Sequence, residues 1–310
     1  MYILNKLSLK RLFVFSFIFI SVNLLAEPVL EEIVVSARKV GENVQDVPIS
    51  MSVFTSSDIS DAGIERPEDF IALTPNVVMA NTVNVGDTLV TIRGLTSTRD
   101  AESNFAFVVD GVLQTNPNAF NRELLDIAQI EVLKGPQGAL YGRNATSGAI
   151  LITTKAPSEE PESTAVVGMG INNSSKLQFV NSSKIRDNVY TRFSFSKRET
   201  DGEHTNVYSN KKNVDFFEDT TFRYRVLVDN DDSSWDFRAG VSEASGGTIN
   251  FNAVFALPAF TGFGTPGADQ FFKDVNDHQF TYMFNVPPVN EQETSDMSLK
   301  YTEDLSDGKE

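Results

Sequence analysis

The stretch EVLKGPQGALYGRNATSGAILITTK, Glu131 to Lys155, decides how this sequence is interpreted. Apolar residues open and close it, and four glycines divide it, Gly135, Gly138, Gly142 and Gly148. A phosphate-binding loop needs Gly-Lys followed by Ser or Thr, whereas the nearby Lys134 stands before the first glycine. The dinucleotide pattern G-x-G-x-x-G is absent as well. We therefore expect the glycines to let the backbone turn tightly between two strands, residues 130–133 and 149–153.

The composition limits the function classes. The chain has 310 residues, with 26 Lys and Arg against 42 Asp and Glu, and a formal net charge of −16. Such a charge repels nucleic acid, so we expect no nucleic-acid partner. There is no cysteine, which excludes thiol catalysis, cysteine–zinc sites and disulfides. The two histidines, His204 and His278, lie apart in polar links, and no Ser-His-Asp or paired-carboxylate arrangement is discernible. We expect no enzymatic activity, no cofactor and no metal site.

The N-terminus carries an export signal. The basic residues Lys6, Lys10 and Arg11 precede an apolar run over residues 12–25. This run is shorter than the roughly 20 residues that a membrane-spanning helix needs. The pattern is typical of a secretory signal peptide over residues 1–26, cleaved after Ala26, and the alternative is an uncleaved anchor.

A short segment, residues 27–43, follows the signal. Its one hydrophobic piece is Ile33-Val34-Val35-Ser36-Ala37, with charged residues on both sides. The piece is too short to bury a core, but its β-branched residues suit an extended strand that pairs with the edge of another sheet. The alternative is a plain linker.

Residues 44–157 are expected to form a compact α+β domain. Strands are predicted over residues 49–53, 89–92, 105–109, 130–133 and 149–153. A helix is predicted to start at residues 55–58 and to end at Gly63, and a second follows Pro67 over residues 68–73.

From residue 162 onward, apolar and polar residues alternate. The alternation is clear over residues 188–197, 220–228, 235–241 and 297–301, and weaker around Leu177 and Phe179. It predicts about six half-buried antiparallel strands, joined by short links in some places and long ones (200–219 and 245–290) in others. Short turns at one rim and long loops at the other are typical of an outer-membrane barrel. The alternative is the antiparallel sandwich of a secreted protein.

The aromatic and basic residues of this region fit the barrel interpretation. Tyr224, Trp235 and Tyr301 suit the aromatic girdles at the two membrane interfaces. Arg223 and Arg225 alternate with the apolar residues, so they are expected to face the lumen and to pair with acidic residues of the α+β domain over residues 44–157.

In this order the three regions resemble the TonB-dependent receptors of Gram-negative outer membranes. The resemblance rests on E-I-V-V-S-A at 32–37, T-I-R-G at 91–94, V-V-D-G-V at 108–112, I-E-V-L-K-G-P at 130–136, L-Y-G-R-N-A at 140–145 and G-A-I at 148–150. It implies a plug domain inside a β-barrel. Ligand would bind on the extracellular side, after which a coupling segment, the TonB box, would add as a strand to the TonB protein of the inner-membrane motor complex.

The resemblance assigns residues to three roles. The TonB box would be Glu32, Ile33, Val34, Val35, Ser36 and Ala37. The structural plug motif would be Arg93, Gly94, Asp110, Gly111, Glu131, Lys134, Gly135, Pro136, Tyr141, Gly142, Asn144 and Gly148, with Glu131 and Lys134 forming a charge network beside Arg93. Ligand contacts at the plug apices would be Arg99, Asp100, Asn104, Asn116, Asn118 and Phe120. The alternative for these six is that they are ordinary solvated loop residues.

The expected fold is thus an α+β plug domain followed by the strands of an antiparallel transmembrane β-barrel. The expected parts are a signal peptide (1–26), a TonB-box segment (27–43), a plug (44–157) and barrel strands (158–310). Six strands are too few to close around such a plug, so we expect a fragment or truncated product, not competent alone.

The expected localisation is the outer membrane, with its lipid as a partner. The expected ligand is a small molecule such as a ferric siderophore, with cobalamin, haem or an oligosaccharide as alternatives. Two further alternatives are a secreted or periplasmic binding or signalling module that uses the plug alone, and a periplasmic carbohydrate-active sandwich.

Overall fold

The computed structural model describes residues 33–36, 39, 41–81, 88–98, 101–206, 210–212, 214–247, 281–282 and 289–304. The expected signal peptide, Glu32, Ala37, Arg99, Asp100 and most of the link 245–290 lie outside these residues. The chain divides into two compact units, residues 1–33 and 34–310, and everything below concerns the second. Among the described residues, no helix is long and apolar enough to cross a membrane.

The plug is built on a five-stranded sheet. Its strands are β3 (Met51–Thr55), β9 (Ile127–Lys134), β10 (Gly148–Thr154), β7 (Phe105–Val109) and β8 (Val112–Gln114), in that order across the sheet. β10 pairs in parallel with β7 and antiparallel with β9. The quoted stretch therefore supplies the two central strands of the sheet, and the chain between them makes the connection from one to the other.

Short helices and two small sheets complete the plug. The helices are α1 (Ser56–Asp61), α2 (Pro67–Ala72), α3 (Gly138–Tyr141) and the 3-10 helix η1 (Pro117–Ala119). The small sheets join β4 (Val77–Asn81), β5 (Thr88–Ile92) and β6 (Leu95–Thr96), and β1 (Val34–Val35) with β2 (Glu42–Asn43). α1 starts where expected because Thr55 accepts from the Asp58 N–H while the Asp58 carboxylate accepts from the Thr55 N–H at 2.9 Å.

Aromatic rings fill the centre of the plug core. Phe70 and Phe120 are the largest fully buried side chains, and Phe120 makes edge-on contacts with Phe105 and Phe107 at 5.2 and 5.1 Å between ring centroids. Edge-to-face pairs at this spacing are favourable beyond the area that they bury. The ring cluster therefore connects β7 to the turn that follows η1.

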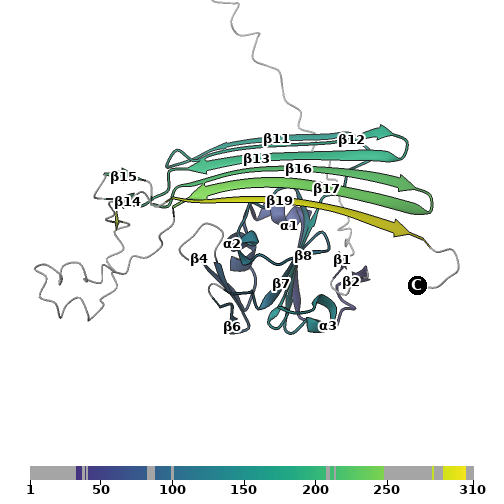
Figure 1. Ribbon diagram of the computed structural model, residues 1–310, viewed down its shortest axis with the longest axis horizontal. Coiled ribbons are helices and arrows are strands. Elements are labelled where there is room, and N and C mark those ends of the chain that lie inside the picture. The colour runs from purple at the N-terminus through teal and green to yellow at the C-terminus, as the bar shows by residue number, and fades with distance from the viewer. Residues whose placement is uncertain are drawn as a thin grey trace, which may run out of the picture. The chain divides into compact units, whose positions relative to one another are not determined.

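The second body is a six-stranded antiparallel sheet (Figure 1). Its strands, in order, are β11 (Glu162–Met169), β12 (Ser175–Arg186), β13 (Val189–Thr200), β16 (Phe217–Asn230), β17 (Ser233–Gly246) and β19 (Asn290–Glu303). The sheet is open, with β11 and β19 at its edges. A separate small sheet joins β14 (Thr205–Asn206), β15 (Lys211–Lys212) and β18 (Thr281–Tyr282).

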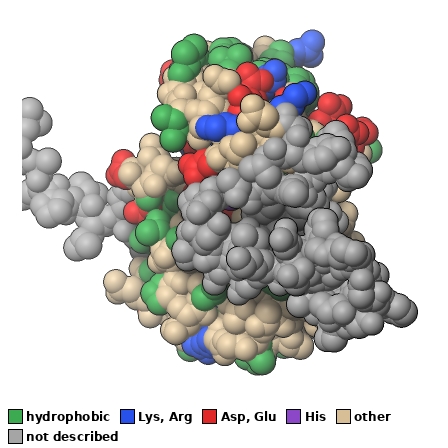
Figure 2. Space-filling view, turned by 90° about the vertical axis from the view of Figure 1, so that its left-hand side faces the viewer, with side chains coloured by type: hydrophobic (Ala, Val, Ile, Leu, Met, Phe, Trp, Pro, Cys, Tyr) green, Lys and Arg blue, Asp and Glu red, His purple; other side chains and the backbone are tan. Residues whose placement is uncertain are grey.

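The two ends of the six-stranded sheet differ. At one end, the two-residue links 187–188 and 231–232 join β12 to β13 and β16 to β17, and we call this end the short-turn rim. At the other end the described strands stop at Met169, Thr200 and Gly246 and resume at Ser175, Phe217 and Asn290, and we call this end the long-link rim. Figure 2 views the molecule from the latter side and shows acidic and basic side chains next to one another.

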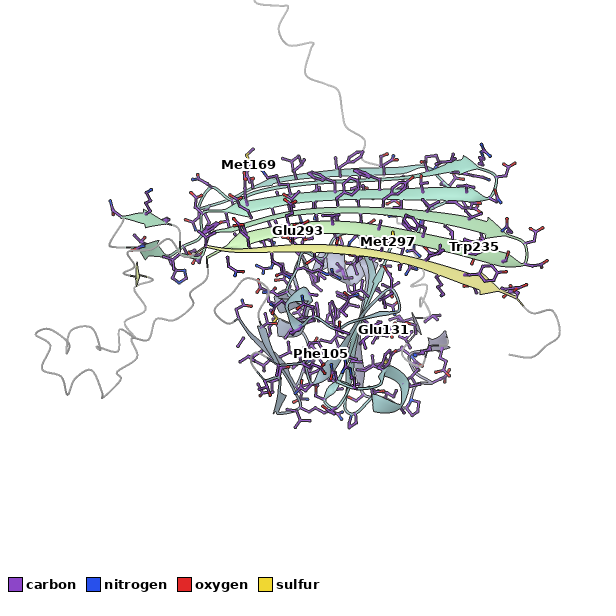
Figure 3. All side chains as sticks on the ribbon, in the orientation of Figure 1. Phe105, Glu131, Met169, Trp235, Glu293 and Met297 are labelled. Carbon is purple, nitrogen blue, oxygen red and sulfur yellow. The ribbon has the colours of Figure 1, made fainter. Side chains whose placement is uncertain are left out.

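The two faces of the sheet also differ, as the alternation predicts. One face exposes Val167, Phe222, Trp235, Met297 and Tyr301, and Figure 3 shows Trp235 and Met297 on the sheet and Phe105 and Glu131 within the plug. The other face carries polar residues that the plug buries, Arg192, Ser194, Ser196, Asp219, Thr221 and Asp236. The sheet is therefore apolar outside and polar where it meets the plug.

The connection inside the quoted stretch contains a short helix, α3, as well as the tight turning of the backbone expected between its two strands. Gly138 begins the helical turn α3, and a Cβ at this position would meet no atom within 4 Å. Gly148 behaves as expected of a packing glycine, because a Cβ there would lie 2.2 Å from the carbonyl oxygen of Leu133. Close packing therefore requires glycine at the start of β10, whereas Gly135 and Gly142 are required by their positive φ angles.

Candidate functional site

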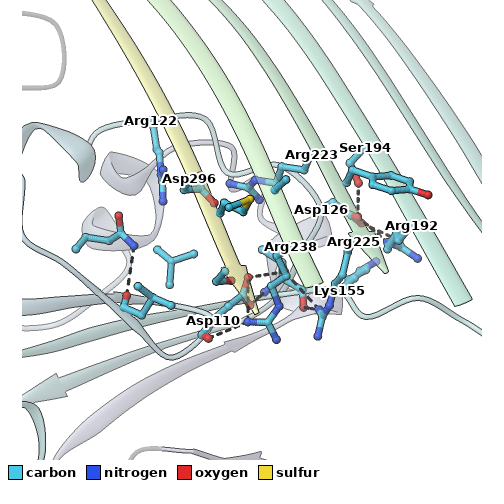
Figure 4. A pocket seen from close by; sticks show the side chains of 18 residues that line it. Asp110, Arg122, Asp126, Lys155, Arg192, Ser194, Arg223, Arg225, Arg238 and Asp296 are labelled. Atoms are coloured by element: carbon cyan, nitrogen blue, oxygen red, sulfur yellow. Dashed lines mark hydrogen bonds and ion pairs between the residues drawn. The ribbon is translucent and has the colours of Figure 1, made fainter. Parts of the chain in front are cut away.

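One ion pair attaches the plug to the six-stranded sheet. Arg192, on the polar face of β13, donates through Nε and Nη2 to both carboxylate oxygens of Asp126, at 2.6 and 2.7 Å (Figure 4). Ser194 Oγ donates to the same carboxylate at 2.6 Å. The side chains of Arg192 and Asp126 are 3% and 7% exposed, so this two-pronged pair lies out of water. It joins the plug directly before β9 to the third strand of the sheet.

Three further arginines of the sheet reach backbone carbonyls of the plug. Arg223 Nη1 donates to the Leu125 oxygen at 2.6 Å. Arg225 donates to the Thr154 oxygen at 3.2 Å, and Arg238 donates to the Asp110 oxygen at 2.8 Å. The expectation that Arg223 and Arg225 pair with plug acids is wrong. Arg225 pairs with Asp236 of the neighbouring strand, because lumen-facing residues of adjacent strands lie closer to it than plug carboxylates do.

The charges around these arginines leave no room for a sizeable ligand. The cavity that they line has a volume of about 70 Å³, which suits a few water molecules and is far below the roughly 300 Å³ of a typical ligand pocket. Arg122 of the plug lines it as well; burial and the neighbouring Arg223 lower the pKa of Arg122 to about 10, so it stays charged at neutral pH. We conclude that this cluster attaches the plug.

A second set of contacts lies toward the long-link rim. The Glu65 carboxylate binds Lys176 of β12, and it accepts from Arg198 of β13 at 2.9 Å. Glu123 is 1% exposed, neither of its carboxylate oxygens has a hydrogen-bond partner, and its nearest cation is Arg198 at 3.7 Å. Burial, only partly offset by Arg198, raises the pKa of Glu123 to about 7. The plug is thus held at both ends of the sheet. The buried Glu123 carboxyl, in contrast, carries a desolvation cost.

The proposed ligand contacts divide into two groups. Asn104 is engaged within the plug, since its side-chain oxygen accepts from Ser97 Oγ and its backbone oxygen from the Thr146 and Ser147 N–H groups. Asn116 and Asn118 lie at η1; Asn116 is exposed and caps the turn, and the Asn118 carbonyl accepts from Gln292 near the long-link end of β19. Of the candidates that the structure describes, only the η1 pair therefore lies on an accessible apex at the long-link rim.

Phe120 is a core residue, so the expectation that it contacts ligand is wrong. It is 2% exposed and sits among Phe70, Phe105 and Phe107. The polar composition of the surrounding loop predicts exposure, but Phe120 follows η1 directly as its C-cap, and its ring is buried in the core.

The segment expected to be the TonB box packs on the plug at the other rim, as far as residues 33–36 describe it. Val34 and Val35 pair with Asn43 and Glu42 in a two-stranded sheet, and Val35 is 1% exposed. The Ser36 N–H and hydroxyl both donate to Oε1 of Glu131, at 3.0 and 2.9 Å. A cavity of about 470 Å³ beside this segment is lined by Ser36, Lys39 and Lys300. Lys300 lies near the C-terminal end of β19. The segment therefore lies toward the short-turn rim.

The motif residues are mostly turn residues with unusual backbone. Arg93, Asp110 and Asn144 have positive φ angles, as do Gly94, Gly111, Gly135 and Gly142. Asp110 also holds its turn by accepting from the N–H and the hydroxyl of Thr154, both at 2.8 Å. Pro136 is exposed at the turn after β9. These positions determine the course of the plug backbone, and we assign them no role in ligand binding.

Glu131 and Lys134 do not form the expected common network. They are three residues apart on β9 and so lie on opposite faces of the sheet. Lys134 Nζ lies 3.2 Å from Ser52 Oγ, whereas Glu131 binds Ser36. Tyr141 lies on the Glu131 side, where burial, with a smaller effect of that carboxylate, raises the pKa of Tyr141 to about 12.

Sequence reasoning missed three residues of the site, Asp126, Gln129 and Arg192. Arg192 belongs to the alternating pattern of residues 188–197, so the pattern predicts which face of the sheet its side chain lies on. The pattern does not predict its partner. Asp126 has a positive φ of 56°, which no local signal indicates. Gln129 donates to the Val34 carbonyl from a strand whose sequence shows no sign of that contact.

Comparison with known proteins agrees with this geometry. Residues 43–149 match the sequence model of the TonB-dependent Receptor Plug Domain. The chain is 26% identical to the pesticin receptor of Yersinia enterocolitica over 190 residues, which cover 61% of this chain and 28% of that protein. It is 28% identical to the vitamin B12 transporter BtuB of Vibrio vulnificus over 182 residues, 57% of this chain and 29% of that protein.

Solved structures show the same fold. The ferric yersiniabactin uptake receptor FyuA from Yersinia pestis superposes with a TM-score of 0.71 at 20% identity, covering 83% of this chain and 39% of that one. The ferripyoverdine receptor of Pseudomonas aeruginosa superposes with a TM-score of 0.58 at 17% identity, covering 68% and 27%. In each case the chain spans well under half of the longer protein.

Proposed function

This chain is a member of the TonB-dependent receptor family, and on that premise we propose that it forms the plug and the first wall strands of an outer-membrane transporter. The proposed localisation is the outer membrane of a Gram-negative cell, reached through the signal peptide of residues 1–26. The proposed parts are the coupling segment 27–43, the plug 44–157 and the wall strands 158–310.

The two-faced sheet supports a place in the membrane. β16, β17 and β19 each run for 14 residues, more than the roughly 9–11 that a tilted strand needs to cross a bilayer. Trp235 and Tyr301 are neighbours on the outer face, 4.6 Å apart between ring centroids and close to the short-turn rim. Aromatic residues at such a position suit a membrane interface. The polar inner face carries the plug.

One observation carries the proposal: the β-branched segment Val34–Ser36 is held at the short-turn rim, while η1 of the plug lies at the long-link rim. A transporter coupled through strand pairing needs a partner strand on one side and a ligand-facing apex on the other. We propose Val34–Ser36 as the strand for the TonB protein, and Asn116 and Asn118 as part of the ligand-facing apex.

The proposed ligand is a small iron-chelate complex of the siderophore class. Support comes from similarity to a ferric yersiniabactin uptake receptor and to a ferripyoverdine receptor bound to ferripyoverdine. Cobalamin is the second candidate, because a vitamin B12 transporter is among the similar proteins. Growth of cells with and without the intact gene, on iron-limited medium and separately on limiting cobalamin, distinguishes the two.

The coupling role is tested by binding to the periplasmic domain of the TonB protein. The full chain in detergent is expected to bind this domain, and Val34→Pro is expected to abolish binding because proline cannot donate to a strand ladder. Val34→Ala is the matched control, since it keeps the backbone N–H and shortens a side chain that is 54% exposed. Equal binding by both variants would refute the coupling role.

A further inference from the structure

The contacts of the coupling segment have the pattern of a strand ladder made by side chains. Gln129 Nε2 donates to the Val34 carbonyl at 3.1 Å, and Glu131 Oε1 accepts from the Ser36 N–H at 3.0 Å. In an extended chain, the C=O of one residue and the N–H of the residue two places on point to the same edge. One donor and one acceptor of the plug thus occupy the two backbone groups that a neighbouring strand would use.

The opposite edge of the segment is also taken. Val35 lies between Val34 and Ser36, so its own N–H and C=O point the other way, toward Glu42 of β2. Its side chain is 1% exposed, which packs the segment down onto the plug. Both edges of the coupling strand are therefore engaged in this structure, one by a backbone and the other by side chains.

The two side chains are set up for this task by their own strand. Gln129 and Glu131 are two residues apart on β9, so they stand side by side on one face of the plug sheet. The Gln129 amide also donates to Glu131 Oε1 at 3.2 Å, and the Ser36 hydroxyl donates to the same oxygen at 2.9 Å. Hydrogen bonds to a carboxylate are stronger than those between neutral groups, and Glu131 is 2% exposed.

We propose that Gln129 and Glu131 act as a stand-in for a β-strand, occupying the free edge of Val34–Ser36 so that a partner strand can add there only after these bonds break. The inference rests on the proposed function, because it concerns access of the TonB protein to its strand. It adds a specific autoinhibitory contact: the plug competes with the partner for the same two backbone groups. Rearrangement of β9 then becomes the event that frees the edge.

The absence of cysteine in the sequence gives a clean assay. Val35→Cys places the only thiol of the full chain at a position that is 1% exposed, so its reaction with a maleimide reports undocking of the segment. Gln129→Glu keeps the shape of the side chain but removes the donor to Val34 and adds a charge beside Glu131. We expect labelling about tenfold faster, the factor that corresponds to loss of a hydrogen bond to a backbone group together with like-charge repulsion.

Two further variants make the result specific. Ser36→Ala removes only the hydroxyl bond to Glu131 and leaves the plug itself unaltered, so it is expected to speed labelling by about threefold. Gln114→Glu is the matched control; it makes the same chemical change on β8, where the amide donates to the Val112 carbonyl of its own hairpin, and it is expected to leave the rate unchanged. Far-UV circular dichroism confirms folding of each variant.

The outcomes separate this inference from the proposed function. Faster labelling together with tighter binding to the TonB periplasmic domain supports the stand-in. Unchanged labelling in both Gln129→Glu and Ser36→Ala overturns it and leaves the coupling role intact. Faster labelling with unchanged TonB binding also overturns it, because the contact would then not limit the partner. If the unsubstituted chain does not bind TonB at all, the coupling role is refuted. The proposal that Gln129 and Glu131 block access of TonB is then refuted as well.

Discussion

Arg192 and Asp126 form the most completely buried ion pair between the plug and the sheet among the described residues, with both carboxylate oxygens bound by one guanidinium. A planar guanidinium facing a carboxylate fixes direction as well as distance. The pair therefore sets the position of the chain that enters β9, which in turn carries Gln129 and Glu131 to the coupling segment. Attachment of the plug and docking of the segment are linked through one strand.

Asp126→Asn should loosen the plug from the sheet. The amide keeps the size and tolerates the positive φ of this position, but it leaves the Arg192 charge without its main partner. Breaking a buried pair in this way costs about 3 kcal/mol or more in local stability. Hydrogen exchange of peptides from residues 121–134 in the detergent-solubilised chain measures it. Asp187→Asn is the control: its exposed carboxylate lies 3.9 Å from Lys184, and no measurable change is expected.

Glu123→Gln should remove a pH dependence of stability. The folded-state pKa of Glu123, about 7, exceeds the ordinary carboxyl pKa of 4.5, so the folded state binds more protons than the unfolded state between these two pH values. Stability therefore falls as pH rises through this window and levels off above it, with a total loss of about 3 kcal/mol. The carboxyl faces Arg198 and Lys176, and also the acidic Glu65 and Asp219.

The measurement for Glu123 is the unfolding midpoint in urea from pH 5 to pH 8. The unsubstituted chain should lose stability over this range, whereas Glu123→Gln should change less and be the more stable of the two at pH 8. Glu160→Gln, which alters an exposed carboxylate, should retain the original profile. A Glu123→Gln chain that is less stable at pH 8 would contradict the assignment.

Gly148→Ala should destabilise the plug, and Gly138→Ala should not. At Gly148 the new methyl group would lie 2.2 Å from a backbone oxygen of β9, and the central strands would have to separate to admit it. Overpacking of this kind costs about 1–3 kcal/mol. At Gly138 there is open space within a helical turn, where alanine is favoured by up to about 1 kcal/mol. Limited proteolysis of the plug at increasing urea compares the two, and similar effects would refute the packing role of Gly148.

Phe120→Ala should act through stability and not through ligand contact. The ring is 2% exposed and touches three other phenylalanine rings, so its removal should cost about 3–5 kcal/mol. Asn116→Ala at the exposed η1 apex removes the cap to the Asn118 N–H, so it should cost only about 1 kcal/mol of plug stability, and it should weaken ligand binding as well. Urea unfolding and binding of a ferric siderophore to the complete receptor distinguish the two effects.

Local patterns located most elements of the fold. The strand β7 begins and ends where the apolar run Phe105–Val109 does, because Asp110-Gly111 ends it with two residues of positive φ. The cap of α1 is likewise written in Thr55 and Asp58. The alternation after residue 162 predicted the strands of the six-stranded sheet, since one face is buried and the other is not.

Long-range relationships were not predictable in the same way. Periodicity tells which face of a strand is buried, but not that β10 lies between β7 and β9. The same limit explains the Arg223 and Arg225 partners: the arginines face the plug as expected, yet which groups they meet depends on how two bodies dock. The prediction that Phe120 contacts ligand was wrong because it rested on the polar composition of the loop, whereas the ring next to η1 packs into the core.

The strand order of the plug has a consequence for how the chain reaches its folded state. β16 and β17 are joined by residues 231–232 alone and form a hairpin by local zipping, whereas β3 must find β9 from across the domain sequence. Closing a long loop costs entropy before any contact repays it, so pairings between distant segments form slowly. Because β10 lies between β9 and β7, the plug sheet cannot be completed until the chain up to residue 154 has joined it. The plug should therefore set the pace of folding, while the wall strands nearest to each other pair early.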